Sequence, residues 1–187
     1  MFEIGPVFTG NKPGEQEIVL AGIKSGLAYR LNWLEKERKL DVFDSKKDVM
    51  QTLYEIGLDN NKTKIDTKTP TYYHPGKSGA IYQNSFDKVP IAFFGEIHPN
   101  IIHKIDIKTD ALIIFEIFLD RIKISDGKIR DLKSKYQYSD FQKSERDFAF
   151  VLDKSFEVQE LIKIISDVDK DLIKSIKVFD VYEGENI

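Results

Sequence analysis

Short segments in which apolar residues alternate with polar ones, or follow one another directly, predict several β-strands. Phe2–Phe8 and residues 17–24 show this pattern near the start of the chain, with a loop rich in glycine, proline and asparagine between them. Residues 80–82 and 91–94 are rich in β-branched and aromatic side chains and flank a polar connection, which predicts a hairpin. Residues 111–119 form one further apolar strand, so the first two thirds of the chain are strand-rich.

The first half also contains one clear helical pattern, over residues 41–57. Asp44 is a suitable N-cap, and Gly57 followed by Leu58 is typical of a helix that ends in a Schellman motif. Pro99 opens a second, shorter helix predicted over residues 99–105. Four apolar residues of the first helix recur at the spacing of one buried stripe: Val49, Met50, Leu53 and Ile56.

The last third of the chain predicts a β-α-β unit. In residues 146–153 the larger side chains of Phe148, Phe150 and Leu152 alternate with Ala149 and Val151. Residues 156–168 carry apolar side chains at helical spacing with Ser155 as N-cap, and residues 173–182 form another alternating segment. The preceding segment, residues 125–140, is polar and basic with almost no apolar pattern, and we interpret it as a linker.

Composition narrows the class of protein. The chain has 187 residues, of which 41% are hydrophobic, with a formal net charge of −3, so it can bury a core and does not bind nucleic acid by bulk charge. It has no cysteine, its start lacks the features of a signal peptide, and no apolar run approaches ~20 residues, which together favour a cytoplasmic protein without a membrane partner. Because strand-like segments begin at residue 2 and end near residue 182, we expect a fragment of a longer chain.

Gly76-Lys77-Ser78 is similar to the end of a phosphate-binding loop. The position five residues before Gly76 is Thr71 rather than glycine, and a strand instead of a helix is predicted to follow. A sharp turn leading into a strand explains these residues better, and we expect no ligand at Lys77.

The histidines suggest no metal site. His74, His98 and His103 lack metal-type spacing, and two of them precede proline, which favours roles in turns. Glu96 and His98 lie two residues apart and would share one face of a strand, so an acid/base pair is possible, although a structural hydrogen bond is the stronger interpretation. An enzyme that uses Glu96 and His98 remains an alternative, while no catalytic residue and no metal ligand is predicted.

Basic and aromatic residues are interleaved between positions 128 and 146. Such a mixture can contact phosphates and stack on bases, as in single-stranded nucleic-acid platforms, although charged runs are more often solvated linkers. A stand-alone RNA-binding module is therefore a second alternative. The residues are Lys128, Arg130, Lys133, Lys135, Tyr136, Tyr138, Phe141, Lys143 and Arg146.

Five ordered motifs carry a family resemblance over almost the whole chain. The chain resembles the C-terminal portion of the bacterial phenylalanine–tRNA ligase β subunit. The motifs are Phe2-Glu3-Ile4-Gly5-Pro6-Val7-Phe8, His74-Pro75-Gly76-Lys77-Ser78-Gly79-Ala80, Gly95-Glu96-Ile97-His98-Pro99, Ser144-Glu145-Arg146-Asp147-Phe148-Ala149 and Phe179-Asp180-Val181-Tyr182-Glu183-Gly184.

The resemblance implies an α+β fold in two parts. Residues 1–124 would be part of a non-catalytic core domain with the antiparallel sheet and flanking helices of a class II aminoacyl-tRNA synthetase. Residues 125–138 would be a linker, and residues 139–187 the first half of a ferredoxin-fold anticodon-binding domain, truncated to β-α-β. Because the family's third strand would lie between the two strands present, we expect this half-domain to be disordered, swapped with a neighbour, or rearranged so that its strands pair directly.

The resemblance also implies a function without chemistry in this segment. The whole enzyme attaches phenylalanine to tRNA(Phe) with ATP and Mg²⁺, whereas this segment would need no cofactor and would serve subunit assembly and binding near the tRNA anticodon. Its partners would be the α subunit, in a heterotetramer of two α and two β subunits, and tRNA(Phe). The residues expected to contact tRNA are Lys143, Arg146, Lys174 and Lys177.

Overall fold

The computed structural model describes residues 1–29, 33, 36–109, 111–124 and 141–182. The chain divides into two compact units, Met1–Lys133 and Ser134–Ile187, which are treated separately below. The linker predicted over residues 125–138 lies outside the described residues. No helix in the described ranges is long and apolar enough to cross a membrane.

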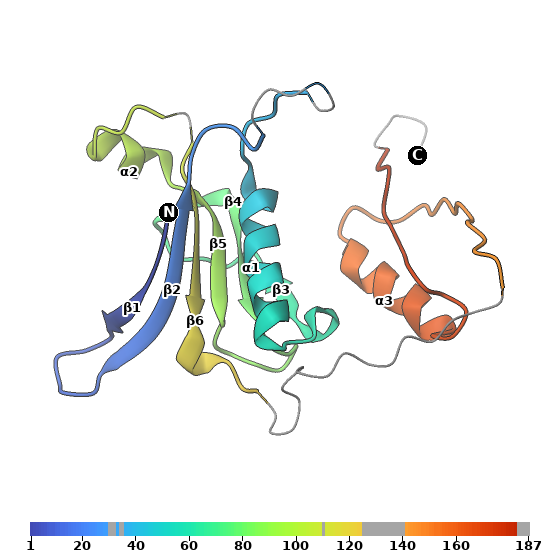
Figure 1. Cartoon of the computed structure of the whole chain (residues 1–187), viewed down its shortest axis with the longest axis horizontal. Helices are drawn as coiled ribbons and strands as arrows, with labels where there is room; N and C mark the ends of the chain where they lie inside the picture. Colours follow the sequence, from blue (N-terminus) through green and yellow to red (C-terminus); the bar gives the residue numbers. More distant parts are fainter. Residues whose placement is uncertain (30–32, 34–35, 110, 125–140, 183–187) are drawn as a thin grey trace. The chain divides into compact units, whose positions relative to one another are not determined.

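The first unit is built on a six-stranded sheet in the order β1-β2-β6-β5-β4-β3, in which each pair of neighbouring strands is antiparallel (Figure 1). The strands predicted between residues 2 and 119 are confirmed, and so is a mixed α/β fold with an antiparallel sheet. The strands are β1 (Phe2–Phe8), β2 (Gln16–Lys24), β3 (Lys64–Asp66), β4 (Tyr73–Tyr82), β5 (Ala92–Ile97) and β6 (Ile113–Phe118).

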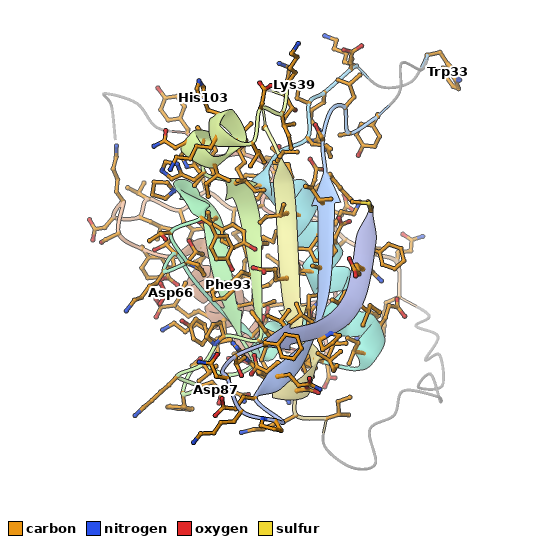
Figure 2. All side chains as sticks on the ribbon, turned by 90° about the vertical axis from the view of Figure 1, so that its left-hand side faces the viewer. Trp33, Lys39, Asp66, Asp87, Phe93 and His103 are labelled. Atoms are coloured by element: carbon orange, nitrogen blue, oxygen red, sulfur yellow. The ribbon has the colours of Figure 1, made fainter. Side chains whose placement is uncertain are left out.

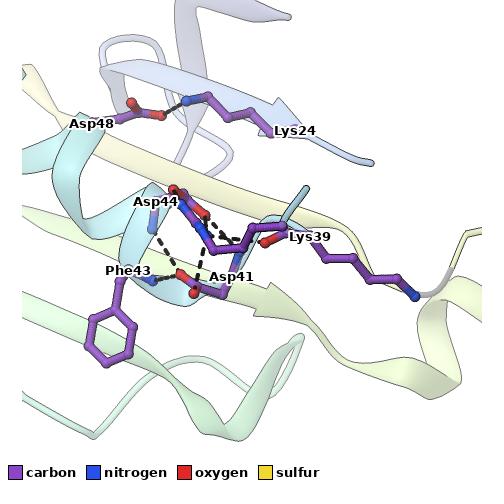
Figure 3. Close-up of polar contacts among 7 residues, drawn as sticks. Lys24, Lys39, Asp41, Phe43, Asp44 and Asp48 are labelled. Carbon is purple, nitrogen blue, oxygen red and sulfur yellow. Dashed lines mark hydrogen bonds and ion pairs between the residues drawn. The ribbon is translucent and has the colours of Figure 1, made fainter. Parts of the chain in front are cut away.

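The helix predicted over residues 41–57 is confirmed as α1 (Val42–Ile56), but its N-cap differs from the predicted one. Asp41, not Asp44, is the N-cap: its side chain accepts hydrogen bonds from the backbone N–H groups of Phe43 and Asp44. Asp44 is the N3 residue of a capping box and accepts from the Asp41 backbone N–H at 2.8 Å (Figure 3). Two aspartates three residues apart both suit an N-cap, and the sequence pattern selected the wrong one.

The C-terminal end of α1 is the predicted Schellman motif. Gly57 has φ 105°, a left-handed conformation that glycine adopts without steric cost. The Gly57 N–H donates to the Tyr54 carbonyl, and the Leu58 N–H donates to the Leu53 carbonyl at 2.9 Å. Leu53 and Leu58 are both buried, so the apolar contact of the motif also forms part of the core.

The core lies between α1 and the middle of the sheet, where the helix packs on β5 and β6. Val49 and Leu53 are fully buried there, while Met50 and Ile56 are partly buried at the margin of the same stripe. Ser45 was not predicted to be buried, but its hydroxyl donates to the Ile114 carbonyl of β6 at 2.7 Å. The sheet supplies most of the remaining core: Ile81, Ile91, Ala92, Phe94, Phe115 and Ile117.

Strand β1 lies at one edge of the sheet. Met1 and Ile23 exchange backbone hydrogen bonds, so odd-numbered residues of β1 pair with β2 and even-numbered ones turn their backbone groups outward. Pro6 therefore lies at an outward position, where its missing N–H removes no bond from the ladder. The aromatic side chains of β1 are exposed to solvent: Phe2 is 74% exposed and Phe8 is 77% exposed.

The predicted turn at residues 75–78 is wrong. These residues lie within β4, and the pairing of β4 with β5 shifts register between Tyr73 and Ser78. The irregularity accommodates Pro75 and Gly76 inside a strand, as bulges commonly do. The sequence pattern marked the disruption correctly but predicted a turn where the strand continues.

In the second unit, one helix forms and the predicted strands do not. Helix α3 (Val158–Val168) begins after Glu157, because Ser155 belongs to a turn in which the Phe156 N–H donates to the Asp153 carbonyl. Between residues 141 and 182 no strand is assigned, so 146–153 and 173–182 neither pair with each other nor form the predicted β-α-β unit. An alternating segment becomes a strand only when a neighbouring strand satisfies its backbone, and pattern alone supplies no partner.

Candidate nucleic-acid interface

Two of the four basic residues expected to contact tRNA, Lys143 and Arg146, both contact Glu145. The Lys143 ammonium is 2.6 Å from the Glu145 carboxylate, and this hydrogen bond is the main cause that lowers the pKa of Glu145. The Arg146 guanidinium donates to the Glu145 backbone carbonyl at 2.9 Å. Because the side chains of Lys143 and Glu145 are 71% and 77% exposed, the pair is a weak surface contact that a phosphate could displace.

Lys174 and Lys177 are exposed in the segment after α3. Among the described residues, no hydrogen bond or ion pair joins them to Lys143 or Arg146. The structure therefore brings together the first two of the predicted residues and does not link them to the other two.

Two exposed aromatic residues follow the basic pair in the sequence. Phe148 and Phe150 lie with ring centroids 6.4 Å apart and are 74% and 51% exposed. Exposed rings beside cationic side chains can stack on unpaired bases while the cations contact phosphates. Phe141 is also exposed, whereas the other predicted members of this cluster lie outside the described residues: Lys128, Arg130, Lys133, Lys135, Tyr136 and Tyr138.

In the Gly-Lys-Ser segment of the first unit, the side chains of Lys77 and Ser78 bind other residues of the chain. The Lys77 ammonium lies 3.0 Å from both carboxylate oxygens of Glu96. The Ser78 hydroxyl donates to the His74 carbonyl and also shares a hydrogen bond with Thr69. These contacts, made from within a strand, contradict a phosphate-binding loop.

The Glu96 and His98 side chains do not form an acid/base pair. Glu96 pairs with Lys77, and His98 caps helix α2 (Pro99–Lys104) by accepting from the Asn100 N–H at 3.2 Å. His74 likewise accepts from the Gly76 N–H, but it lies within strand β4, so the turn role predicted for it is wrong although its contact is structural. The described residues contain no group of three or more histidine, cysteine, aspartate or glutamate side chains that could hold a metal ion.

The face of the sheet turned away from α1 carries polar contacts that the sequence did not predict. The hydroxyls of Tyr72 and Tyr73 donate to the same oxygen of Glu116, at 2.7 and 3.0 Å. Burial, together with the Glu116 charge and these bonds, raises the pKa of both tyrosines well above its usual value. The only sequence signal was a single glutamate that interrupts the apolar run of β6.

Two small cavities lie among the described residues of the first unit. One, of about 120 Å³, is lined by residues that include Gly57, Asp59, Gln83 and Lys123. Another, of about 110 Å³, is lined by residues that include Leu27, Leu40 and Thr109. Neither lining includes Glu96 or His98.

Comparison with models of known protein families shows which family the chain belongs to. The family model described as the phenylalanyl tRNA synthetase beta chain CLM domain matches residues 1–119, which is more than half of the chain. The chain belongs to the phenylalanyl-tRNA synthetase beta chain family. A second model, the ferredoxin-fold anticodon binding domain, matches residues 139–187 and so assigns that fold to the segment that contains α3.

Curated members of the phenylalanyl-tRNA synthetase beta chain family match the chain from end to end. The phenylalanine–tRNA ligase beta subunit of Paramagnetospirillum magneticum is 35% identical over all of this chain and 23% of its own length. That of Bartonella quintana is 39% identical over 98% of this chain and 23% of its own length. The chain thus spans about a quarter of the length of these relatives.

Proposed function

We propose that the chain acts within the β subunit of a phenylalanine–tRNA ligase, which attaches phenylalanine to tRNA(Phe). In this proposal it serves subunit assembly and binding near the anticodon, and performs no chemistry. The observation that carries the proposal is the pair of family matches, in which the second is an anticodon-binding domain. The exposed basic and aromatic residues after position 140 agree with that role.

The first unit would then be a class II synthetase-like core that has lost its catalytic role. Its antiparallel sheet with a helix packed on one face is compatible with that class. The whole enzyme would use ATP and Mg²⁺ in the cytoplasm. In this proposal ATP and Mg²⁺ act elsewhere in the enzyme, and this segment needs no cofactor. The proposed boundaries are residues 1–124 for the core, 125–138 for a linker and 139–187 for the anticodon-binding segment.

The proposed contacts to tRNA are electrostatic. Lys143, Arg146, Lys174 and Lys177 are exposed, and exposed cations bind phosphates with a strong dependence on salt. Exposed Phe148 and Phe150 would add stacking on anticodon-loop bases. A stand-alone RNA-binding module would instead bind tRNA tightly without the remainder of a β subunit, and titration of this chain alone with tRNA(Phe) distinguishes the two.

The proposed partner is the α subunit, in an enzyme of two α and two β chains. Strand β1 provides a surface suited to such a contact, since Phe2, Ile4 and Phe8 are exposed on the side of the sheet where α1 packs on β5 and β6. Exposed aromatic residues in a regular strand are typical of a surface that another chain covers.

Co-purification tests this proposal. A β chain of the relatives' length that carries this segment should retain the α subunit, and Phe8→Ser should weaken that retention. Phe86→Ser is the matched control, because Phe86 is 95% exposed but lies outside the strands. Failure of the unmodified β chain to bind the α subunit would contradict the proposed function, and equal effects of the two variants would contradict the role of β1.

A self-contained enzyme that uses Glu96 and His98 is disfavoured by the contacts described above. Glu96 is held by Lys77 and His98 by the start of α2, and neither lines the described cavities. His98→Ala should therefore lower the stability of the fold slightly, by about 1 kcal/mol for the loss of a cap.

A further inference from the structure

The sheet face turned away from α1 has a row of aromatic side chains interrupted by carboxylates. Tyr73 and Phe93 have ring centroids 6.1 Å apart, and Phe93 and Phe118 meet edge-on at 5.6 Å. Figure 2 looks onto this face, with Phe93 labelled near the middle of the sheet and α1 behind it. Because residues that pair directly across strands share a face, β1, β2 and β6 place three carboxylates here: Glu3, Glu17 and Glu116.

One of these carboxylates is already neutralised by the chain itself. Arg121 donates from Nε and Nη2 to the two oxygens of Glu17, at 3.0 and 2.6 Å. Its guanidinium carbon also lies 3.8 Å from the centroid of the Phe118 ring. A carboxylate beside an aromatic ring on this face thus binds a guanidinium by a forked hydrogen bond and by stacking.

Glu116 is a second carboxylate on this face that lies beside aromatic rings. Both tyrosine hydroxyls bind its Oε2 atom, and the rings of Tyr72 and Tyr73 lie 5.0 Å apart beside it. Phe93 lies directly across the ladder from Glu116. In the described part of the chain no lysine or arginine lies within ion-pair distance of this carboxylate, so a Tyr72–Tyr73–Phe93–Glu116 cluster is present without a cation.

We propose that the Tyr72–Tyr73–Phe93–Glu116 cluster binds an arginine side chain presented by a partner protein. Glu17 and Arg121 show that this face accommodates a guanidinium, and the negative charge of Glu116 and Glu3 attracts one. A planar guanidinium suits the cluster better than an ammonium, because it can stack on a tyrosine ring while it donates to a carboxylate. An enclosed small molecule is not the expected ligand, since neither described cavity is lined by these residues.

Titration of the whole chain with the peptide acetyl-Gly-Arg-Gly-amide tests the proposal, with the citrulline peptide as an uncharged control of nearly the same shape. The backbone amide signals of Tyr73, Phe93 and Glu116 should shift with the arginine peptide in a saturable way. Glu116→Gln should weaken this binding by roughly tenfold, while Glu55→Gln, which removes an exposed carboxylate from α1, should leave it unchanged.

A second variant separates binding from folding. Tyr72 is 39% exposed, so Tyr72→Ala should keep the fold, seen in an unchanged amide spectrum away from the cluster, and still weaken binding of the arginine peptide. Equal shifts with the citrulline peptide, equal binding by the Glu116→Gln variant, or the absence of saturable shifts at these residues would each overturn the proposal.

Discussion

Gly79 of β4 lies directly opposite Phe94 of β5, and the Phe94 ring occupies the space that a side chain at position 79 would need. A methyl group added to Gly79 would lie 2.5 Å from the tip of that ring. Gly22 of β2 has the same relationship to Phe115 of β6, with a distance of 2.3 Å. Two glycines thus leave room for the rings of two adjacent core phenylalanines, Phe94 and Phe115.

Gly79→Ala should lower the free energy of unfolding by about 1–3 kcal/mol, because the buried Phe94 ring cannot move away without disturbing the core. Gly76→Ala is the matched control in the same strand, since its added methyl group would meet no atom closer than 3.8 Å. Urea denaturation of the two variants measures the difference. Equal losses would show that the Phe94 ring does not require glycine at position 79.

Arg121→Lys should destabilise the first unit although it preserves the charge. Arg121 binds Glu17 by a fork, donates to the Pro90 carbonyl at 3.0 Å and stacks on Phe118, so it joins three segments of the sheet. Lysine can reproduce the charge but neither the fork nor the stacking, and the expected cost is roughly 1–2 kcal/mol. Thermal denaturation beside an Arg146→Lys control measures it, and two identical melting temperatures would contradict the prediction.

The start of α1 should contribute to acid sensitivity. The Arg38 hydrogen bond is the main cause that holds the pKa of Asp44 at about 2, with help from the Asp41 N–H and the charge of Lys24. Because this pKa is lower in the folded protein than the ordinary 3.8, the stabilisation is complete above about pH 4 and is lost as the pH falls toward about 2. The stability deficit of Asp44→Asn should therefore be largest near neutral pH and shrink in acid.

Urea midpoints of the Asp44→Asn variant and the unmodified protein, compared at neutral and acidic pH, check this dependence. Comparing the two proteins at each pH removes the contribution of all other carboxylates. A deficit that stays constant with pH would show that Asp44 acts only through its hydrogen bonds and not through its charge.

Local patterns predicted the elements of the first unit well, because α1 and the strands each carry their own periodicity and stop signals. Gly57 with Leu58 identified the end of α1 from sequence alone. The N-cap was wrong by three residues because Asp41 and Asp44 are both suitable, and only the surrounding chain decides between them. The turn predicted at residues 75–78 failed for a similar reason, since pairing with β5 carries Pro75 and Gly76 within a strand.

Long-range contacts could not be predicted in this way. Glu116 meets Tyr72 and Tyr73 across more than forty residues, and Arg121 meets Glu17 across more than one hundred. No local sequence pattern identifies the partners in either contact, because strand order brings them together. In the second unit, alternation at residues 146–153 predicted a strand that does not form, since the pattern specifies a face but not a partner.

Enzyme assays that separate amino-acid activation from transfer to tRNA test the central proposal most directly. A ligase assembled from the α subunit and a full-length β chain would carry glutamine at Lys143, Arg146, Lys174 and Lys177. We expect unchanged phenylalanine-dependent exchange of pyrophosphate into ATP, and a KM for tRNA(Phe) raised by roughly tenfold with a reduced dependence on salt. Loss of the exchange reaction, or an unchanged KM for tRNA(Phe), would contradict a segment that binds tRNA and performs no chemistry.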